Sequence, residues 1–132
     1  QEARDVVAGF TTALDMTAKD IHEENPRFLI RAKSFDTFFS FGPPMLTTDE
    51  IAEVLDVKVI TGKNGDLLHE TIVFNMRYRP WFAVSLHSQV MKFFPGDIIL
   101  TGTPGATVIR EGDVVECHID GFENLKNPVV AG

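Results

Sequence analysis

The chain has 132 residues, a length that fits one domain with one hydrophobic core. Its net charge of −7 argues against nucleic acid as the main partner, because a phosphate backbone needs a basic protein face. The single cysteine, Cys117, excludes an intramolecular disulfide and a zinc site with several cysteine ligands, and its alternating surroundings predict a buried, inert thiol. No run of 18 apolar residues occurs, so we expect no membrane span and a cytoplasmic protein, or a mitochondrial one in a eukaryote.

The first half of the chain predicts strands and short helices. Residues 6–16 are apolar and β-branched, which favours a strand, and residues 16–25 favour a helix that stops at an Asn-Pro pair. Residues 28–42 are rich in aromatic side chains and predict an extended chain. A threonine followed by Asp and Glu is a helix start signal, so residues 47–55 predict a further helix.

The second half contains the clearest local signal, an Asn-Gly pair between two β-rich runs. Residues 56–62 and 66–74 are therefore expected to form a β-hairpin around Asn64 and Gly65. Residues 80–93 begin with proline and place apolar side chains near helical spacing, which predicts a helix.

Two later segments share one pattern. Residues 95–105 and 111–121 each contain Gly-Asp followed by two aliphatic residues. We interpret this pattern as one turn geometry used twice, each time followed by a strand. Because strands follow strands through short turns, the chain predicts an α+β domain dominated by β-structure, with a few short helices, and not a series of βαβ units.

Two charged residues stand beside apolar runs. Asp15 ends the first predicted strand, where a carboxylate caps a helix, meets a cation or binds a hard metal such as Mg²⁺ or Mn²⁺. One carboxylate does not make a metal site by itself. Lys33 either extends its ammonium to water or is held by a carboxylate, and in a functional site it would face a substrate carbonyl or carboxylate. Asp36 need not pair with it, because the two side chains face opposite ways in an extended chain.

Further polar residues have both a structural and a functional interpretation. Lys19 and His22 share one face of the predicted helix, which is either solvated or part of a pocket wall. Residues 101–105, TGTPG, form a turn in which Thr103 and nearby amides could cradle a carboxylate. Three histidines have no spacing that indicates a metal site and are interpreted as structural: His69, His87 and His118.

Five segments carry a resemblance to a known protein family, in this order: AGFTTALDMTAKD, AKSFDTFFSFGP, the Asn-Gly hairpin, PGDIILTGTPG and EGDVVECHIDGFENLKNPV. This is the fumarylacetoacetate hydrolase (FAH) family, which the chain resembles over nearly its whole length. The resemblance implies the mixed β-sandwich roll of the FAH C-terminal domain, often dimeric, and a divalent metal, first Mg²⁺, with Mn²⁺ or Ca²⁺ as alternatives. It also implies a small anionic 2-oxo or 2,4-dioxo acid as substrate. Such enzymes, which include 2-hydroxyhepta-2,4-diene-1,7-dioate isomerases and acylpyruvases, hydrolyse acylpyruvates, decarboxylate oxaloacetate, or isomerise or hydrate ring-cleavage products of aromatic compounds. The step shared by these reactions is stabilisation of an enolate.

The family's site residues are carried over by position. Asp15 matches a metal ligand, and Lys33 matches the catalytic lysine that contacts a substrate oxygen. Gly102 and Thr103 match the loop that binds the substrate carboxylate.

Two positions depart from the family pattern. Lys19 stands where many members have Arg, and His22 stands where many have Gln; both would line the substrate pocket. Lys19 keeps a cation but loses the bidentate fork of Arg, which puts the substrate preference in doubt.

The main departure is an absence. The family's Glu-x-Glu metal ligands and its lid lie upstream of the Asp ligand, and no Glu-x-Glu occurs in this sequence. We therefore expect residues 1–132 to be the C-terminal part of a single FAH-like catalytic domain that works as a homodimer. The alternatives are a non-catalytic or scaffold module of FAH type without a complete metal site and, third, a generic β-barrel binding domain.

Overall fold

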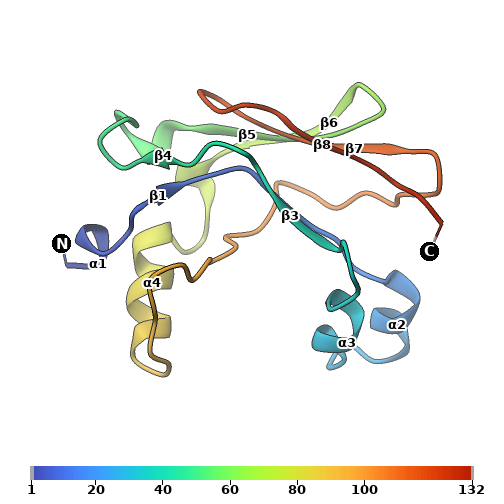
Figure 1. Cartoon of the computed structure of the whole chain (residues 1–132), viewed down its shortest axis with the longest axis horizontal. Coiled ribbons are helices and arrows are strands. Elements are labelled where there is room, and N and C mark those ends of the chain that lie inside the picture. Colours follow the sequence, from blue (N-terminus) through green and yellow to red (C-terminus); the bar gives the residue numbers. More distant parts are fainter. Residues whose placement is uncertain (1, 132) are drawn as a thin grey trace.

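The computed structural model describes residues 2–131, and antiparallel strands with short helices make up its regular structure (Figure 1). The elements in chain order are α1 (Glu2–Asp5), β1 (Gly9–Phe10), β2 (Ala13–Asp15), α2 (Lys19–Glu24), α3 (Leu29–Lys33), β3 (Phe39–Phe41), β4 (Leu46–Thr47), η1 (Val54–Asp56), β5 (Lys58–Lys63), β6 (Asp66–Ile72), η2 (Val73–Asn75), α4 (Pro80–Ser88), β7 (Val114–Ile119) and β8 (Leu125–Pro128). The prediction of a β-dominated α+β domain is confirmed. No helix of the described residues is long and apolar enough to cross a membrane.

The main sheet has the strand order β6-β5-β7-β8, and all its pairs are antiparallel. β5 and β6 form the predicted hairpin. Asn64 and Gly65 have φ angles of 56° and 89°, the left-handed values that a two-residue type I′ turn requires. The Gly65 amide donates to Glu116 Oε1 on β7 at 2.7 Å, so the turn is tied to the next strand of the sheet.

Glu116 is a buried carboxylate with three partners. Only 3% of its surface is exposed, and its Oε2 accepts from Lys126 Nζ at 2.7 Å and pairs with His118 Nε2 at 3.0 Å. The hydrogen bond from Lys126 is the largest of the effects that lower the pKa of Glu116, and the amide of Gly65 and the ring of His118 act in the same direction. A buried charge is tolerated here because each of its oxygens has a donor.

The hydrophobic core lies between β2 and the main sheet. Its buried side chains are Leu14, Val115, Cys117 and Leu125. The prediction of a buried thiol is confirmed, and burial raises the pKa of Cys117, which keeps the thiol protonated and inert.

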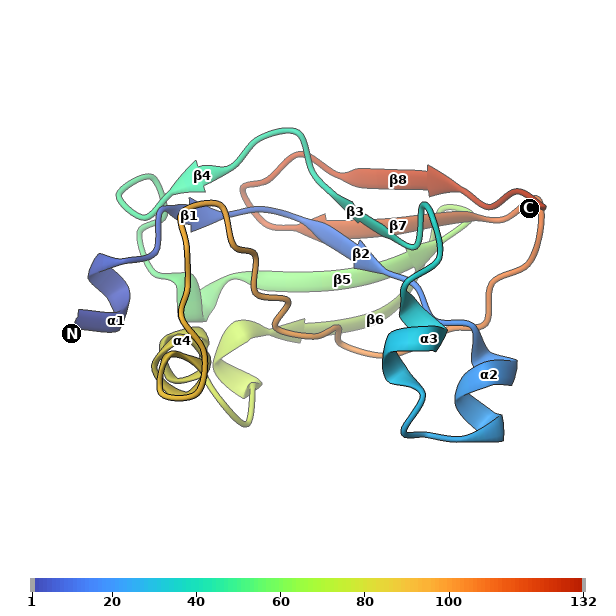
Figure 2. The ribbon, with the colours of Figure 1, turned by 60° about the horizontal axis from the view of Figure 1, so that its bottom comes forward.

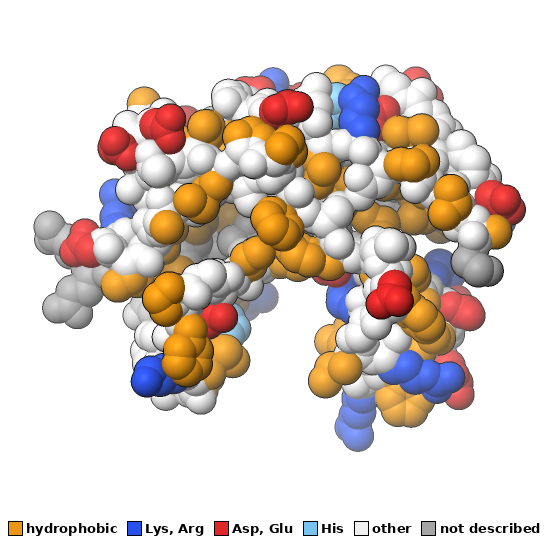
Figure 3. All heavy atoms as spheres, in the orientation of Figure 1, with side chains coloured by type: hydrophobic (Ala, Val, Ile, Leu, Met, Phe, Trp, Pro, Cys, Tyr) orange, Lys and Arg blue, Asp and Glu red, His pale blue; other side chains and the backbone are white. Residues whose placement is uncertain are grey.

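β2 and β3 pair antiparallel, with Leu14 opposite Ser40. Residues 16–38 between these strands leave the sheet as an excursion that carries α2 and α3 (Figure 2). On the same side of the sheet, α4 projects at the opposite end of the molecule (Figure 1). Figure 3 shows a hollow between the two helical projections, with hydrophobic side chains gathered on its roof. Residues 97–110 cross from one projection towards the other in both ribbon views.

Two predictions near the helices hold only in part. The strand expected over residues 6–16 is interrupted between β1 and β2, where the Thr11 hydroxyl donates to the Pro44 carbonyl at 2.8 Å. The helix expected over residues 80–93 forms as α4 and ends at Ser88. The helix expected over residues 16–25 is confirmed by α2, which stops before the Asn-Pro pair.

Two further predictions are wrong. Residues 28–42 are not extended throughout, because residues with high helix propensity in Leu29–Lys33 form α3. Residues 47–55 do not form the expected helix. The Thr47 amide and hydroxyl both donate to Glu50 Oε2 at 2.8 Å, so these contacts close a single turn, and only the short η1 comes after it.

Candidate functional site

An ion pair joins two of the predicted site residues. Lys33 Nζ lies 2.6 Å from Asp15 Oδ2, and about a third of each side chain is exposed. Asp15 is the last residue of β2, and Lys33 is the last residue of α3. Among the roles weighed for Asp15, the structure shows the cation partner. The helix-cap interpretation is wrong, because α2 has Ala18 at its N-cap position and no side-chain cap.

Backbone hydrogen bonds place the two charged side chains together. The Met16 amide donates to the Phe38 carbonyl at 2.7 Å, directly after β2 and before β3. The Ala18 amide donates to the Ala32 carbonyl at 2.8 Å, which joins the segment after Asp15 to α3. Ala32 is fully buried, and its small side chain lets α3 approach this segment closely. Lys33, the next residue, therefore extends toward the end of β2.

The ammonium of Lys33 has two protein partners. Besides Asp15 it donates to Thr17 Oγ1 at 2.9 Å. A lysine ammonium has three N–H donors, so these two bonds leave one donor for an outside oxygen. Thr17 was not among the predicted site residues; its one signal in the sequence was a hydroxyl placed two residues after Asp15.

α2 carries the two residues predicted to line the pocket. Lys19 forms an ion pair with Glu23 one helical turn later, and both side chains are exposed. His22, on the last turn of α2, is half-buried. The pair between Lys19 and Glu23 matches the solvated-face interpretation of this helix, and the pocket role of both residues stays a prediction.

Gly102 and Thr103 lie in the segment that crosses the hollow. Gly102 has a φ of 98° and is exposed, and the Thr103 hydroxyl donates to the Gly105 carbonyl at 3.4 Å. The strand expected within residues 95–105 is wrong, because no strand of the described residues pairs with them. The structure therefore does not join this loop to the Asp15–Lys33 pair by any hydrogen bond among the described residues.

A metal site needs several ligand side chains that point to one position. Within residues 2–131, no group of three or more His, Cys, Asp or Glu side chains converges on one point. Asp15 can give one carboxylate, and its Oδ2 is already bound to Lys33. Hard cations such as Mg²⁺ take oxygen ligands, so Asp15 suits them chemically, but the described residues do not form a metal site on their own.

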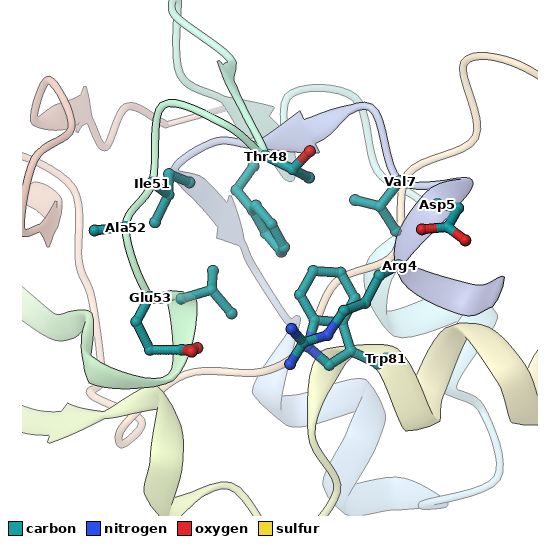
Figure 4. Close-up of a pocket in the computed structure, with 10 residues that line it drawn as sticks. Arg4, Asp5, Val7, Thr48, Ile51, Ala52, Glu53 and Trp81 are labelled. Atoms are coloured by element: carbon teal, nitrogen blue, oxygen red, sulfur yellow. The ribbon is translucent and has the colours of Figure 1, made fainter. Parts of the chain in front are cut away.

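A cavity of about 320 Å³ lies at the other end of the molecule, between α1, β1, η1 and α4 (Figure 4). The guanidinium of Arg4 lies 4.9 Å from the centre of the Trp81 ring, and Glu53 lies across the cavity from it. None of the predicted site residues lines this cavity. No local sequence pattern predicts this cavity, because its walls come from segments far apart in the chain.

The comparisons with known proteins agree with this fold. The family model of the fumarylacetoacetate (FAA) hydrolase C-terminal domain matches residues 1–130. The human mitochondrial oxaloacetate tautomerase FAHD2B is 35% identical over 133 residues, which cover 94% of this chain and 42% of that protein.

Two solved structures are similar over almost the whole chain. A 5-carboxymethyl-2-hydroxymuconate delta-isomerase from Mycobacterium smegmatis has a TM-score of 0.90 at 34% identity, with 98% of this chain and 50% of that one covered. A fumarylacetoacetate hydrolase from Exiguobacterium antarcticum has a TM-score of 0.91 at 32% identity, with 99% and 50% covered. The chain belongs to the fumarylacetoacetate hydrolase family, and it spans about half the length of these relatives.

Proposed function

We propose that this chain forms part of the active site of an enzyme that acts on a 2-oxo or 2,4-dioxo acid through an enolate. One observation carries the proposal: Lys33 is held by Asp15 and Thr17 with one N–H donor left over. A fixed ammonium with a free donor suits an oxygen that gains negative charge during a reaction, because it needs no rearrangement at that moment. The family membership supports the same chemistry.

In the proposed reaction Lys33 donates to the keto oxygen of the substrate and holds the negative charge of the enolate that forms there. The amide of Gly102 and the hydroxyl of Thr103 bind the substrate carboxylate, while Lys19 and His22 line the pocket. Asp15 fixes the ammonium by the 2.6 Å ion pair and is proposed as one carboxylate ligand of a divalent metal, with Mg²⁺ as the first candidate and Mn²⁺ or Ca²⁺ as alternatives.

The names of the relatives favour the enolate as the common feature. An oxaloacetate tautomerase, as the human relative is named, moves a proton between the keto and enol forms of a 2-oxo acid. A delta-isomerase, as the mycobacterial structure is named, moves a double bond. A cation at the keto oxygen assists both reactions, because each passes through an enol or enolate. We propose keto–enol conversion of oxaloacetate as the first reaction to test, before decarboxylation and acylpyruvate hydrolysis.

A second candidate is a non-catalytic module of the FAH type. It is favoured by the absence of a metal-ligand group within residues 2–131. In that case Asp15 and Lys33 would form only a structural ion pair. The proposal further includes a homodimer and a cytoplasmic or mitochondrial location.

The test is an assay of the full-length protein with oxaloacetate and with an acylpyruvate, with added Mg²⁺ and after chelation. Tautomerisation is detected as loss of the enol form, decarboxylation as release of pyruvate, and hydrolysis as release of an acid. We expect turnover of at least one substrate, and turnover that disappears on chelation would support the metal. No turnover above the uncatalysed rate with Mg²⁺ or Mn²⁺ would overturn the proposal in favour of the non-catalytic module.

A further inference from the structure

One contact between distant segments has no role in the function proposed so far. Gly105, at the end of the TGTPG loop, lies directly against the imidazole of His69. A Cβ atom placed on Gly105 would lie 2.5 Å from Cγ and 2.7 Å from Nδ1 of that ring. Real Cβ contacts are essentially never this close, so the ring occupies the space that any side chain at position 105 would need. A side chain at position 105 would therefore have to displace the ring or the loop, and the reason is the close approach and not the backbone angles of Gly105.

The two partners differ in how firmly they are held. His69 stands on β6 and is paired with Thr61 of β5 in the main sheet. Gly105 belongs to residues 97–110, which contain no helix or strand. The backbone of His69 is therefore held by the sheet, and its exposed side chain lies against a loop that has no strand partner among the described residues. Site residues on loops are held accurately only when a rigid element supports them.

The contact lies two residues from the proposed carboxylate binder. The Thr103 hydroxyl donates to the carbonyl of Gly105 at 3.4 Å, so a shift of Gly105 also moves Thr103. Gly102 precedes it with a φ of 98°, a backbone conformation that points its amide in a direction set by the turn. A shift of Gly105 would thus be passed on to both groups, which lie two and three residues before it in the chain.

We propose that His69 is a positioning residue whose ring seats the TGTPG loop and so places Gly102 and Thr103 to bind the substrate carboxylate. This inference rests on the proposed function of the loop. His69 does not touch the substrate in this proposal, and its contribution is a flat surface, so a phenylalanine at the same position would replace it. His69 was interpreted as structural, and in this proposal its structural role is to support the loop that carries Gly102 and Thr103.

The test uses four variants of the full-length protein, assayed with oxaloacetate and an acylpyruvate. His69→Ala removes the ring, and we expect KM to rise roughly 10- to 100-fold with a much smaller change in kcat, because substrate binding is displaced. His69→Phe should restore KM to within about threefold of the original, since the ring surface is kept. Gly105→Ala should raise KM by pushing the loop off the ring. Combining it with His69→Ala should cost less than the product of the two single effects, because the Cβ then fills the vacated space.

A matched control is His87→Ala, which removes an exposed ring whose Nδ1 lies 2.7 Å from the Ala83 carbonyl of the same helix. It should leave KM unchanged. An unchanged KM in His69→Ala, or a failure of His69→Phe to restore it, would overturn the inference.

The backbone dynamics of the loop separate this inference from the function on which it rests. NMR order parameters of the non-proline residues among 101–106 measure these dynamics. His69→Ala should lower the order parameters, and His69→Phe should not, whether or not the protein turns over substrate. Unchanged order parameters in His69→Ala would overturn the contact as a support for the loop. Lowered order parameters in a protein that shows no turnover even without substitution would overturn the proposed function and leave a purely structural contact.

Discussion

Two turns of the molecule have the same geometry and different continuations. Residues 94–97 and 110–113 each place a glycine with left-handed φ, 98° and 88°, before an aspartate. In each, the aspartate carboxylate accepts from the backbone amide three residues earlier at 2.8 Å. The aspartate amide in turn donates to the carbonyl of that earlier residue, at 3.1 Å in the first turn and 3.0 Å in the second. The interpretation of one turn geometry used twice is confirmed.

The chain takes a different course after each turn. After Asp113 it enters β7, which pairs with β5 on one side and β8 on the other and supplies core residues. After Asp97 it continues as an unpaired segment that carries Gly102 and Thr103. Four residues are enough to make the turn, but a strand needs neighbours, and those lie elsewhere in the chain. The molecule thus separates into the main sheet, where stability is concentrated, and segments outside that sheet, which carry the proposed site.

The most severe expected loss on the site side comes from Asp15→Ala. The substitution removes the partner that holds Lys33 and the proposed metal ligand, so we expect turnover to fall to background and Mn²⁺ binding, measured by calorimetry, to weaken. The Tm should change little, because the pair is partly exposed. Asp36→Ala, at an exposed carboxylate in the same excursion, is the control and should stay active. Full activity of Asp15→Ala in excess Mg²⁺ would refute the ligand assignment.

Lys33→Met should lower kcat by roughly 10²- to 10³-fold, the size of losing one group that stabilises an oxyanion. Steady-state kinetics with the best substrate measures this effect. Lys58→Met is the matched control, because Lys58 also forms an ion pair, with Glu70 at 3.1 Å, but lies within the main sheet. If the loss in Lys33→Met appears only in KM, Lys33 binds substrate and transition state equally and does not stabilise the enolate.

Glu116→Ala tests the sheet side of the comparison. It leaves the Gly65 amide without its acceptor, which should lower the free energy of unfolding by roughly 1 to 3 kcal/mol. Urea unfolding followed by circular dichroism measures the change. Glu116→Gln keeps an acceptor oxygen for Gly65 and should cost less. A loss of kcat without a loss of stability would contradict the division between sheet and site.

The two turn aspartates compare the regions directly. Asp113→Ala should lower the Tm, because the Asp113 carboxylate also accepts from Asn64 Nδ2 at 2.8 Å in the hairpin turn. Asp97→Ala removes the same turn contact from the unpaired segment, so it should change the Tm less and raise KM more. Thermal unfolding and steady-state kinetics on both variants decide. Equal losses of Tm would mean that the contribution of each aspartate to stability depends on the turn alone and not on the segment that follows it.

The smallest expected effect is on acid stability. The pKa of Glu116 is lowered in the folded protein, chiefly by Lys126, and that of Asp113 is lowered chiefly by Asn64. A carboxyl group with a depressed folded pKa contributes stability above its unfolded pKa, whose ordinary values are 4.5 and 3.8 here, and loses it as pH falls through the folded pKa. The Tm should therefore be level above about pH 5 and fall below it. The Tm of Asp113→Ala should fall less steeply on acidification, because one of the two carboxyl groups with a lowered pKa is gone.

The parts of the fold that sequence predicts best are those with local causes. The hairpin was predictable from Asn64-Gly65, and the two Gly-Asp turns were predictable from a repeated pattern. The strand expected in residues 95–105 failed because strand formation depends on distant partners. Leu29–Lys33 was misassigned because aromatic neighbours outweighed its helix propensity.

The candidate site was predictable as a set of residues and not as a geometry. Asp15 and Lys33 are 18 positions apart, and their contact depends on backbone bonds made by Ala18 and Ala32 that no local pattern announces. The contact between His69 and Gly105 joins a strand to a loop across the fold and had no sequence signal.

The excursion of residues 16–38 from the β2–β3 pair has an evolutionary consequence. Its two ends are fixed by strands that pair with each other, so its length and content can drift without disturbing the sheet. It carries Lys33, Lys19 and His22, whereas Gly102 and Thr103 lie on a different excursion. The two residues proposed to line the pocket, Lys19 and His22, can therefore change between lineages while the paired strands on either side stay the same, which gives one scaffold a route to different pocket walls.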